Sequence, residues 1–91
     1  MPKILEINGY QISIWSNENN EPIHVHVSKR RPSKNSTKLW LLSNGTFVMA
    51  NPNDKRISPK DMRAIIAKLN QNAVLIKNFW ISYHGYEKYY M

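Results

Sequence analysis

The fold is decided at residues 5–14, which read Leu-Glu-Ile-Asn-Gly-Tyr-Gln-Ile-Ser-Ile. The central Asn-Gly pair tolerates the positive φ angles of a type I′ turn, so the stretch predicts a hairpin with strands at residues 3–7 and 10–15. If Ile7 pairs with Tyr10, the apolar side chains share one face and most polar ones share the other. Turn chemistry and alternation agree, and they predict an antiparallel sheet.

A second Asn-Gly pair stands at positions 44 and 45. A two-residue turn there would pair Leu42 with Phe47. The opposite face would then carry three apolar side chains: Leu39, Leu41 and Val48. An antiparallel sheet covered on one side should alternate, so either this hairpin is covered on both sides or one face contacts another protein. With one helical segment available to cover the sheet, we favour the partner contact.

A helix is predicted to begin after Ser58, because Ser suits the N-cap, Pro59 suits the first turn and Asp61 follows three residues after the cap. Its apolar side chains recur at three- and four-residue steps on one side: Met62, Ile65, Ile66, Leu69, Ala73, Ile76, Trp80 and Tyr83. Residues 70–72, Asn-Gln-Asn, could bend or divide the helix, and Gly85 suits its end.

Three apolar residues of this helix lie off the stripe: Val74, Leu75 and Ile81. Either a neighbouring chain covers them or they mark a break in the helix. Trp80 and Tyr83 continue the stripe and are expected in the core. Beyond them, the tail carries three tyrosines that are candidate contact residues: Tyr86, Tyr89 and Tyr90. Of these, we select Tyr86 and Tyr89 as partner contacts.

The order of these elements predicts the fold class. A polar segment at residues 16–22 leads into a further strand at residues 23–28, and no gap before residue 50 can hold the crossover helix that a parallel sheet requires. We predict an α+β fold, in which an antiparallel β-meander of about five strands packs on a C-terminal helix or broken helix pair. A chain of 91 residues with one continuous pattern forms a single domain, residues 1–91.

Composition limits the function. Thirteen Lys and Arg against six Asp and Glu give a formal charge of +7, which favours a nucleic acid or an acidic protein as partner, or serves solubility alone. Cysteine is absent, which excludes disulfides, thiolate nucleophiles and cysteine zinc sites and fits a reducing cytoplasm. No long apolar run predicts a membrane span or a secretory signal, so a cytoplasmic protein is expected.

Two histidines mark the candidate site. His24 and His26 alternate with apolar residues in the predicted strand, so both side chains project to the same side. They can make ordinary hydrogen bonds, serve acid–base chemistry on a phosphate or bind a metal. A metal would need a third ligand, for which the candidates His84, Glu18 and Glu21 lie on other elements. No cofactor and no metal are predicted.

A basic segment continues from the histidine strand. Residues 29–38 have the composition of a loop and carry five cations: Lys29, Arg30, Arg31, Lys34 and Lys38. Such a loop can follow a phosphate backbone, and it can equally be a solvated tip. If the protein were a nuclease, its arginines could stabilise the charge that develops beside His24 and His26.

Residues 16–27, which read Ser-Asn-Glu-Asn-Asn-Glu-Pro-Ile-His-Val-His-Val, resemble the signature S-N-E-x-x-E-P-P-H-h-H-V of the bacterial domain-of-unknown-function family 4160, where h is hydrophobic. The resemblance extends over nearly the whole chain, with two departures. Ile23 stands in place of the second proline, and the basic loop is longer. The resemblance implies a hairpin at residues 4–10, a strand at residues 38–41 and a C-terminal helix, and such proteins look like parts of toxin–antitoxin-type or mobile-element gene pairs.

These observations rank three functions. The first is a small cytoplasmic protein that contacts nucleic acid through the basic loop and a cognate protein, or a second copy, through an apolar face. The second is a nuclease, with or without metal, that uses His24 and His26. The third is a protein-interaction subunit with an acidic partner.

Overall fold

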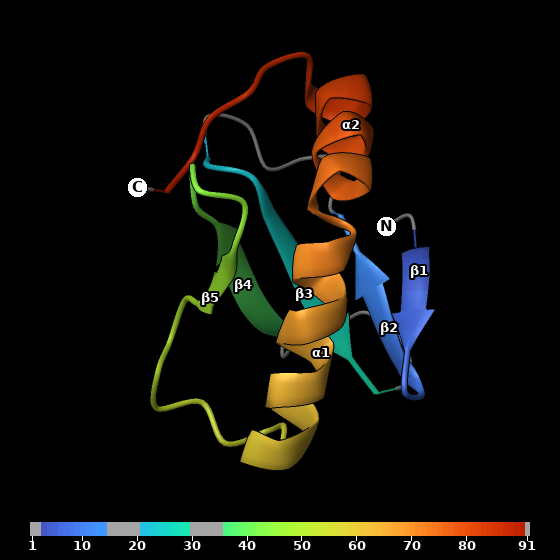
Figure 1. Cartoon of the computed structure of the whole chain (residues 1–91), viewed down its shortest axis with the longest axis vertical. Coiled ribbons are helices and arrows are strands. Elements are labelled where there is room, and N and C mark those ends of the chain that lie inside the picture. Colours follow the sequence, from blue (N-terminus) through green and yellow to red (C-terminus); the bar gives the residue numbers. More distant parts are fainter. Residues whose placement is uncertain (1–2, 15–20, 30–35, 91) are drawn as a thin grey trace.

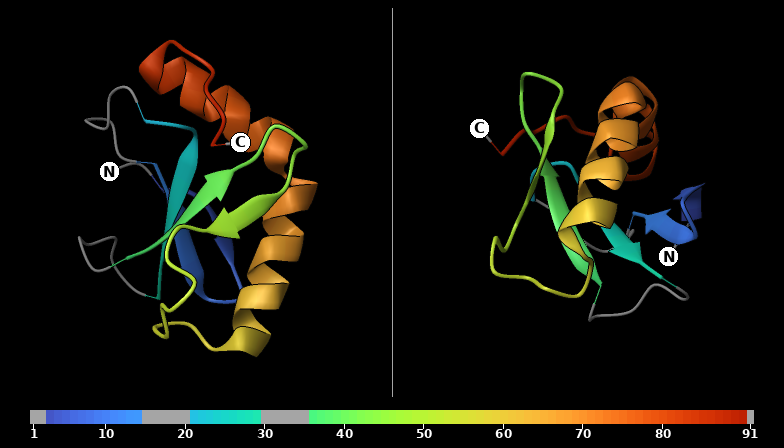
Figure 2. Two further views of the ribbon diagram at one scale, coloured as in Figure 1. Left: turned by 90° about the vertical axis from the view of Figure 1, so that its left-hand side faces the viewer. Right: turned by 60° about the horizontal axis from the view of Figure 1, so that its bottom comes forward.

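The protein is an antiparallel five-stranded sheet followed by two helices. Its structure, a computed structural model, describes residues 3–14, 21–29 and 36–90. Each strand pairs with the next along the chain, and α1 crosses one face of the sheet (Figure 1; Figure 2). The predicted α+β meander is confirmed. The elements are β1 (Lys3–Ile7), β2 (Tyr10–Ser13), β3 (His24–Ser28), β4 (Thr37–Leu41), β5 (Phe47–Met49), α1 (Pro59–Gln71) and α2 (Ala73–His84).

The first hairpin has the predicted register. Ile7 pairs with Tyr10, and the turn residues Asn8 and Gly9 have φ angles of 52° and 83°. Tyr10 is buried, and its hydroxyl donates to Asp61 Oδ2 at 2.8 Å. This hydrogen bond raises the pKa of Tyr10, because the carboxylate favours the protonated phenol. It ties β2 to the first turn of α1.

The second hairpin differs from the prediction by one residue. The Leu42 N–H donates to the Thr46 carbonyl at 2.8 Å, and the Gly45 N–H donates to the Leu42 carbonyl at 3.0 Å, so the loop contains three residues. Gly45 has a φ of 88°, as expected for the left-handed residue that ends such a loop. Leu41 consequently pairs with Phe47.

Because side chains alternate along a strand, this shift places Phe47 and Met49 on the same face as Leu39 and Leu41, and Val48 on the opposite face with Trp40. Leu39 and Leu41 are 0% and 2% exposed, within the core. In this structure they pack inside the protein, and a partner contact through them stays an untested prediction. Val48 is half-buried and pairs with Trp40, and a partner contact through Val48 stays a prediction.

The helical segment is divided at Asn72, an alternative that the sequence left open. Ser58 caps α1 as predicted, since its Oγ accepts from the Asp61 N–H at 3.2 Å. At Asn72, the side-chain amide donates to the Lys68 carbonyl at 2.8 Å and satisfies a backbone group that the helix end leaves free. Gly85 ends α2 with a φ of 78°, as predicted.

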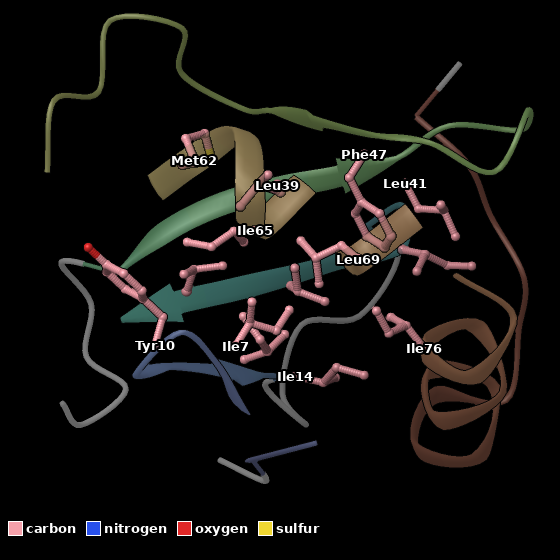
Figure 3. Packing of buried hydrophobic residues seen from close by; sticks show 14 of the residues in the cluster. Ile7, Tyr10, Ile14, Leu39, Leu41, Phe47, Met62, Ile65, Leu69 and Ile76 are labelled. Carbon is pink, nitrogen blue, oxygen red and sulfur yellow. The ribbon is translucent and has the colours of Figure 1, made fainter. Parts of the chain in front are cut away.

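The core lies between the sheet and the apolar stripe of the helices (Figure 3). Met62 lies at the end where the arrowhead of β3 points, and Ile76 lies at the other end. Trp80 is fully buried, but Tyr83 is 47% exposed, so the expectation that Tyr83 belongs to the core is wrong. After the break at Asn72, the side chains of Ile76, Trp80 and His84, which are spaced four residues apart, share the inner side of α2. The side chain of Tyr83 faces outward. No helix among the described residues is long and apolar enough to cross a membrane.

Candidate functional site

His24 and His26 lie side by side on β3, as predicted. They pair with Trp40 and Lys38 of β4, and the centroids of the two imidazole rings are 5.1 Å apart. Both histidines are buried, however, with exposed fractions of 0% and 7%. Acid–base chemistry on a phosphate requires a hydrogen-bond contact with the substrate. In this conformation His24 is closed to such a contact, and catalysis by the pair stays an untested prediction.

The surroundings of His24 are those of a core residue. Its Nδ1 lies 2.8 Å from the Pro22 carbonyl oxygen, which accepts a hydrogen bond when Nδ1 carries the proton. The imidazole ring lies 5.2 Å from the ring of Trp40 and 5.0 Å from the ring of Trp80. Burial of a polar side chain is tolerated when it has a hydrogen-bond partner, and the backbone provides one here. His24 therefore joins β3 to β4 and α2.

Trp80 contacts both His24 and His84. The centroid of its ring lies 4.0 Å from that of the His84 imidazole, on which it stacks, and 5.0 Å from that of the His24 imidazole. Within residues 3–14, 21–29 and 36–90, no group of three His, Asp or Glu side chains could hold a metal ion. Glu21, another candidate ligand, forms an ion pair with Lys38, and Glu18 lies outside the described residues.

The tail after α2 closes this cluster of rings. The Tyr86 hydroxyl donates to the Glu21 carbonyl at 2.7 Å, and the Ile23 N–H donates to the Lys88 carbonyl at 2.7 Å. Tyr90 stacks on Trp40 with 5.1 Å between centroids. We call the set the aromatic junction: His24, His26, Trp40, Trp80, His84, Tyr86 and Tyr90. The signature segment thus has a structural role, since its glutamate, proline and first histidine all bond or pack within the chain.

Partner contacts through the tail remain untested. Tyr86 is half-buried and uses its hydroxyl within the chain. Tyr89 packs partly against the core, and its hydroxyl donates a hydrogen bond to the Glu87 carboxylate. This hydrogen bond raises the pKa of Tyr89, because the neighbouring carboxylate opposes ionisation of the phenol. Neither contact points to a particular partner.

The predicted basic loop is described only at its ends. Lys29 is exposed. Lys38 forms an ion pair with Glu21 at 2.8 Å, and its Nζ lies 4.3 Å from the centre of the Trp40 ring. Lys38 is therefore held within the fold, which makes it a weaker candidate for contacting nucleic acid. The remaining loop cations, Arg30, Arg31 and Lys34, lie outside the described residues.

Further cations gather at the end of the molecule from which this loop leaves. β3, which ends just before Lys29, points toward the lower end of the molecule in Figure 1, where the loop into α1 and the first turn of α1 also lie. We call this region the basic end and define it by the described cations of these segments: Lys29, Lys55, Arg56, Lys60 and Arg63. Sequence reasoning missed the last four, because other residues separate them over nine positions and they form no run.

Most cations of the basic end have no acidic partner among the described residues. Asp54 is held by Arg56, whose Nη2 lies 2.5 Å from its Oδ2, and Asp61 accepts from Tyr10. Within the described part of the chain, no carboxylate forms an ion pair with the other four cations: Lys29, Lys55, Lys60 and Arg63. Their charge is left to attract anions from solution.

A groove of about 330 Å³ opens beside these cations. Its apolar wall includes Pro52, Ile57 and Met62, and its charged lining consists of Lys55, Arg63 and Asp54, the last of which is paired with Arg56. An apolar wall with two cations can hold a flat ring that carries an anionic group. Nucleotides combine these two features.

We expect the Asp54–Arg56 pair to make stability depend on pH. The guanidinium lowers the pKa of Asp54 from 3.8 to about 2, since it hydrogen-bonds the ionised carboxylate. Because the folded pKa is below the unfolded one, this stabilisation is present above about pH 4 and is lost as the pH falls toward 2. The pair lies in a surface loop where water screens it, so we expect about 1 kcal/mol.

Urea unfolding between these two pH values, followed by circular dichroism, measures this contribution. Asp54→Asn should be less stable than the parent at neutral pH and should lose about 1 kcal/mol less on acidification. Equal acid sensitivity in the two proteins would contradict the assignment.

Fold and site together define a small α+β protein with an aromatic junction and a basic end. The chain belongs to the family described as Domain of unknown function (DUF4160), whose model matches residues 9–81. The match covers both histidines of β3 and all five cations of the basic end. Comparison with curated proteins gives no match, and comparison with solved structures gives none.

Proposed function

We propose that this protein is a small cytoplasmic nucleic-acid-binding component of a bacterial toxin–antitoxin-type or mobile-element module. The observation that carries the proposal is the basic end, where four exposed cations have no acidic partner among the described residues. Each cation that neutralises a phosphate releases a condensed counterion, which favours binding. The whole chain also carries a net positive charge, +7, which attracts a polyanion as the basic end does.

The groove at the basic end favours nucleic acid over an acidic protein. To bind a carboxylate-rich protein surface, positive charge alone would suffice. The groove also has an apolar wall, formed by Met49, Ile57 and Met62, next to Lys55 and Arg63. An unpaired base can pack on apolar side chains while its phosphate meets a cation. We therefore expect single-stranded nucleic acid to bind more tightly than duplex of the same length.

The proposed binding does not use the buried rings of the aromatic junction. His24 is fully buried, and Trp80 and Trp40 pack on it from α2 and β4. Bases stack on exposed rings, and these rings are occupied by one another. The function that we propose therefore belongs to the opposite end of the molecule from α2 (Figure 1).

The test is fluorescence anisotropy with a labelled RNA strand and a labelled DNA duplex over a range of NaCl concentrations. Four phosphate contacts predict that log K falls with log salt with a slope of about −3 to −4 on duplex and somewhat less on a single strand. Absence of binding at low salt would overturn the proposal and would favour the acidic protein partner. Gel analysis of the same samples, with and without EDTA, tests the nuclease alternative.

A further inference from the structure

The turn of the first hairpin exposes an Asn-Gly pair to solvent. Asn8 and Gly9 are both exposed, with φ angles of 52° and 83°. Within the described part of the chain, no hydrogen bond holds the Asn8 side chain or the Gly9 N–H. Glycine has no Cβ to shield its nitrogen, which makes Asn-Gly the pair in which asparagine most readily loses its side-chain amide. The turn is therefore a candidate site of spontaneous modification.

We propose that Asn8 deamidates and that the carboxylate formed weakens nucleic-acid binding at the basic end. The Gly9 nitrogen gives its proton to a base in the solvent and forms a bond to Asn8 Cγ. The bond from Cγ to Nδ2 breaks, ammonia leaves with a proton taken from solvent, and a five-membered succinimide remains. Water then opens either carbonyl of this ring to give aspartate or isoaspartate. The modification is independent of the proposed function, whereas its effect on binding rests on that function.

Ring closure requires rotation of the backbone at Asn8, so the turn must open first. β1 lies at the edge of the sheet, and among the described strands it pairs with β2 alone. Segments near a terminus or an edge open at a lower free energy than the centre of a fold. The hairpin can therefore open locally while β2 stays paired with β3.

The second Asn-Gly pair has the same chemistry, but its reacting groups are held by hydrogen bonds. Asn44 Oδ1 accepts from the Thr46 N–H at 3.1 Å and from the Thr46 hydroxyl at 2.6 Å. The Gly45 N–H donates to the Leu42 carbonyl at 3.0 Å. These three hydrogen bonds must break before Gly45 can attack Asn44. We therefore expect Asn44 to react at least about tenfold more slowly than Asn8.

The Asn8-Gly9 turn lies at the basic end. Gln11 of β2 pairs with Ser28 of β3, and this antiparallel register places the start of β2 beside Lys29. Figure 1 shows the turn between β1 and β2 at the same end of the molecule as the first turn of α1. A carboxylate at this position repels phosphate and offsets the neighbouring cations. Deamidation of Asn8 therefore lowers the positive charge where the proposed binding needs it.

Peptide mapping by mass spectrometry tests the modification by itself. The full chain is incubated at mildly alkaline pH, and the deamidated fractions at Asn8 and Asn44 are followed over time. Asn8 should react at least about tenfold faster than Asn44. Equal rates, or a faster reaction at Asn44, would contradict the assignment of the site.

Two matched variants test the effect on binding to a labelled RNA strand by fluorescence anisotropy. Asn8→Asp and Asn44→Asp lower the net charge equally, and Asp-Gly suits hairpin turns as Asn-Gly does. Asn8→Asp should bind about three- to tenfold more weakly than the parent at low salt. Asn44 lies beside the start of α2, away from the basic end, so Asn44→Asp should bind within about twofold of the parent. Equal affinities of the two variants would overturn the effect on binding.

Asn8→Gly connects the two measurements, because it removes the reacting amide and Gly-Gly suits the same turn. After the alkaline incubation the parent should have lost affinity for RNA, and Asn8→Gly should have kept it. Equal loss in both proteins would show that deamidation of Asn8 is not the cause. If the parent binds no RNA before incubation, the proposed function fails and the effect on binding fails with it. The mapped rates then still confirm or overturn the site of modification.

Discussion

Replacing Trp80 by Ala is expected to lower the free energy of unfolding by about 3–5 kcal/mol. Trp80 is 0% exposed and contacts His24, His84 and Tyr86 by its rings. The substitution removes a large apolar surface and leaves a cavity that these rings can fill only in part. A domain of this size is stable by roughly 5–10 kcal/mol, so the variant should retain about half of its stability or less. Urea unfolding followed by far-ultraviolet circular dichroism measures the change.

Tyr83→Ala provides the matched control within the same helix. Tyr83 is 47% exposed, so its loss should cost less than about 1 kcal/mol. Similar losses for the two variants would show that α2 does not present Trp80 inward. His24→Ala, which removes a ring that contacts the indole, should fall between them at about 2–3 kcal/mol, because it also leaves the Pro22 carbonyl without its partner.

The sequence was sufficient for features in which local chemistry and pattern agree. Asn8 and Gly9 adopt the positive φ angles that the first hairpin needs, and Ser58 and Gly85 delimit the helical segment. The second Asn-Gly pair shows the limit of such reasoning. Asn-Gly serves a two-residue turn and a three-residue loop with a terminal left-handed glycine equally well. The choice is made by packing against α1, where the Asn70 side chain accepts from the Phe47 N–H at 2.9 Å.

Only the local part of the candidate site was predicted, because the sequence pattern reports neighbours along the chain and not distant contacts. Alternation along a strand places His24 and His26 on one side, and the structure agrees. Their burial depends on segments more than fifty residues away, such as Trp80 and the tail that bonds Glu21 through Tyr86, and no local pattern reports such contacts. The basic end likewise depends on the fold, because α1 and the β3 terminus bring together cations that are separated in sequence.

Neutralising the basic end should weaken nucleic-acid binding far more than neutralising the same charge elsewhere. The variant Lys55→Ala, Lys60→Ala and Arg63→Ala removes three exposed cations without an acidic partner among the described residues. We expect about 10–100-fold weaker binding at moderate salt and a salt slope flatter by about 2–3. Stability should change by less than about 0.5 kcal/mol per site, as for most exposed substitutions. Anisotropy titrations over NaCl concentration measure both quantities.

The control removes three positive charges outside the basic end, at Lys68, Lys77 and Lys88. Net charge falls equally in the two variants, so any difference between them reports the position of the cations and not their number. We expect the control to bind within about threefold of the parent and to keep its salt slope. Replacing Lys29, Arg30 and Arg31 by Ala tests the loop in the same way and should resemble the first variant. If all three variants lose affinity equally, the chain attracts nucleic acid by net charge alone, and the basic end is not its binding surface.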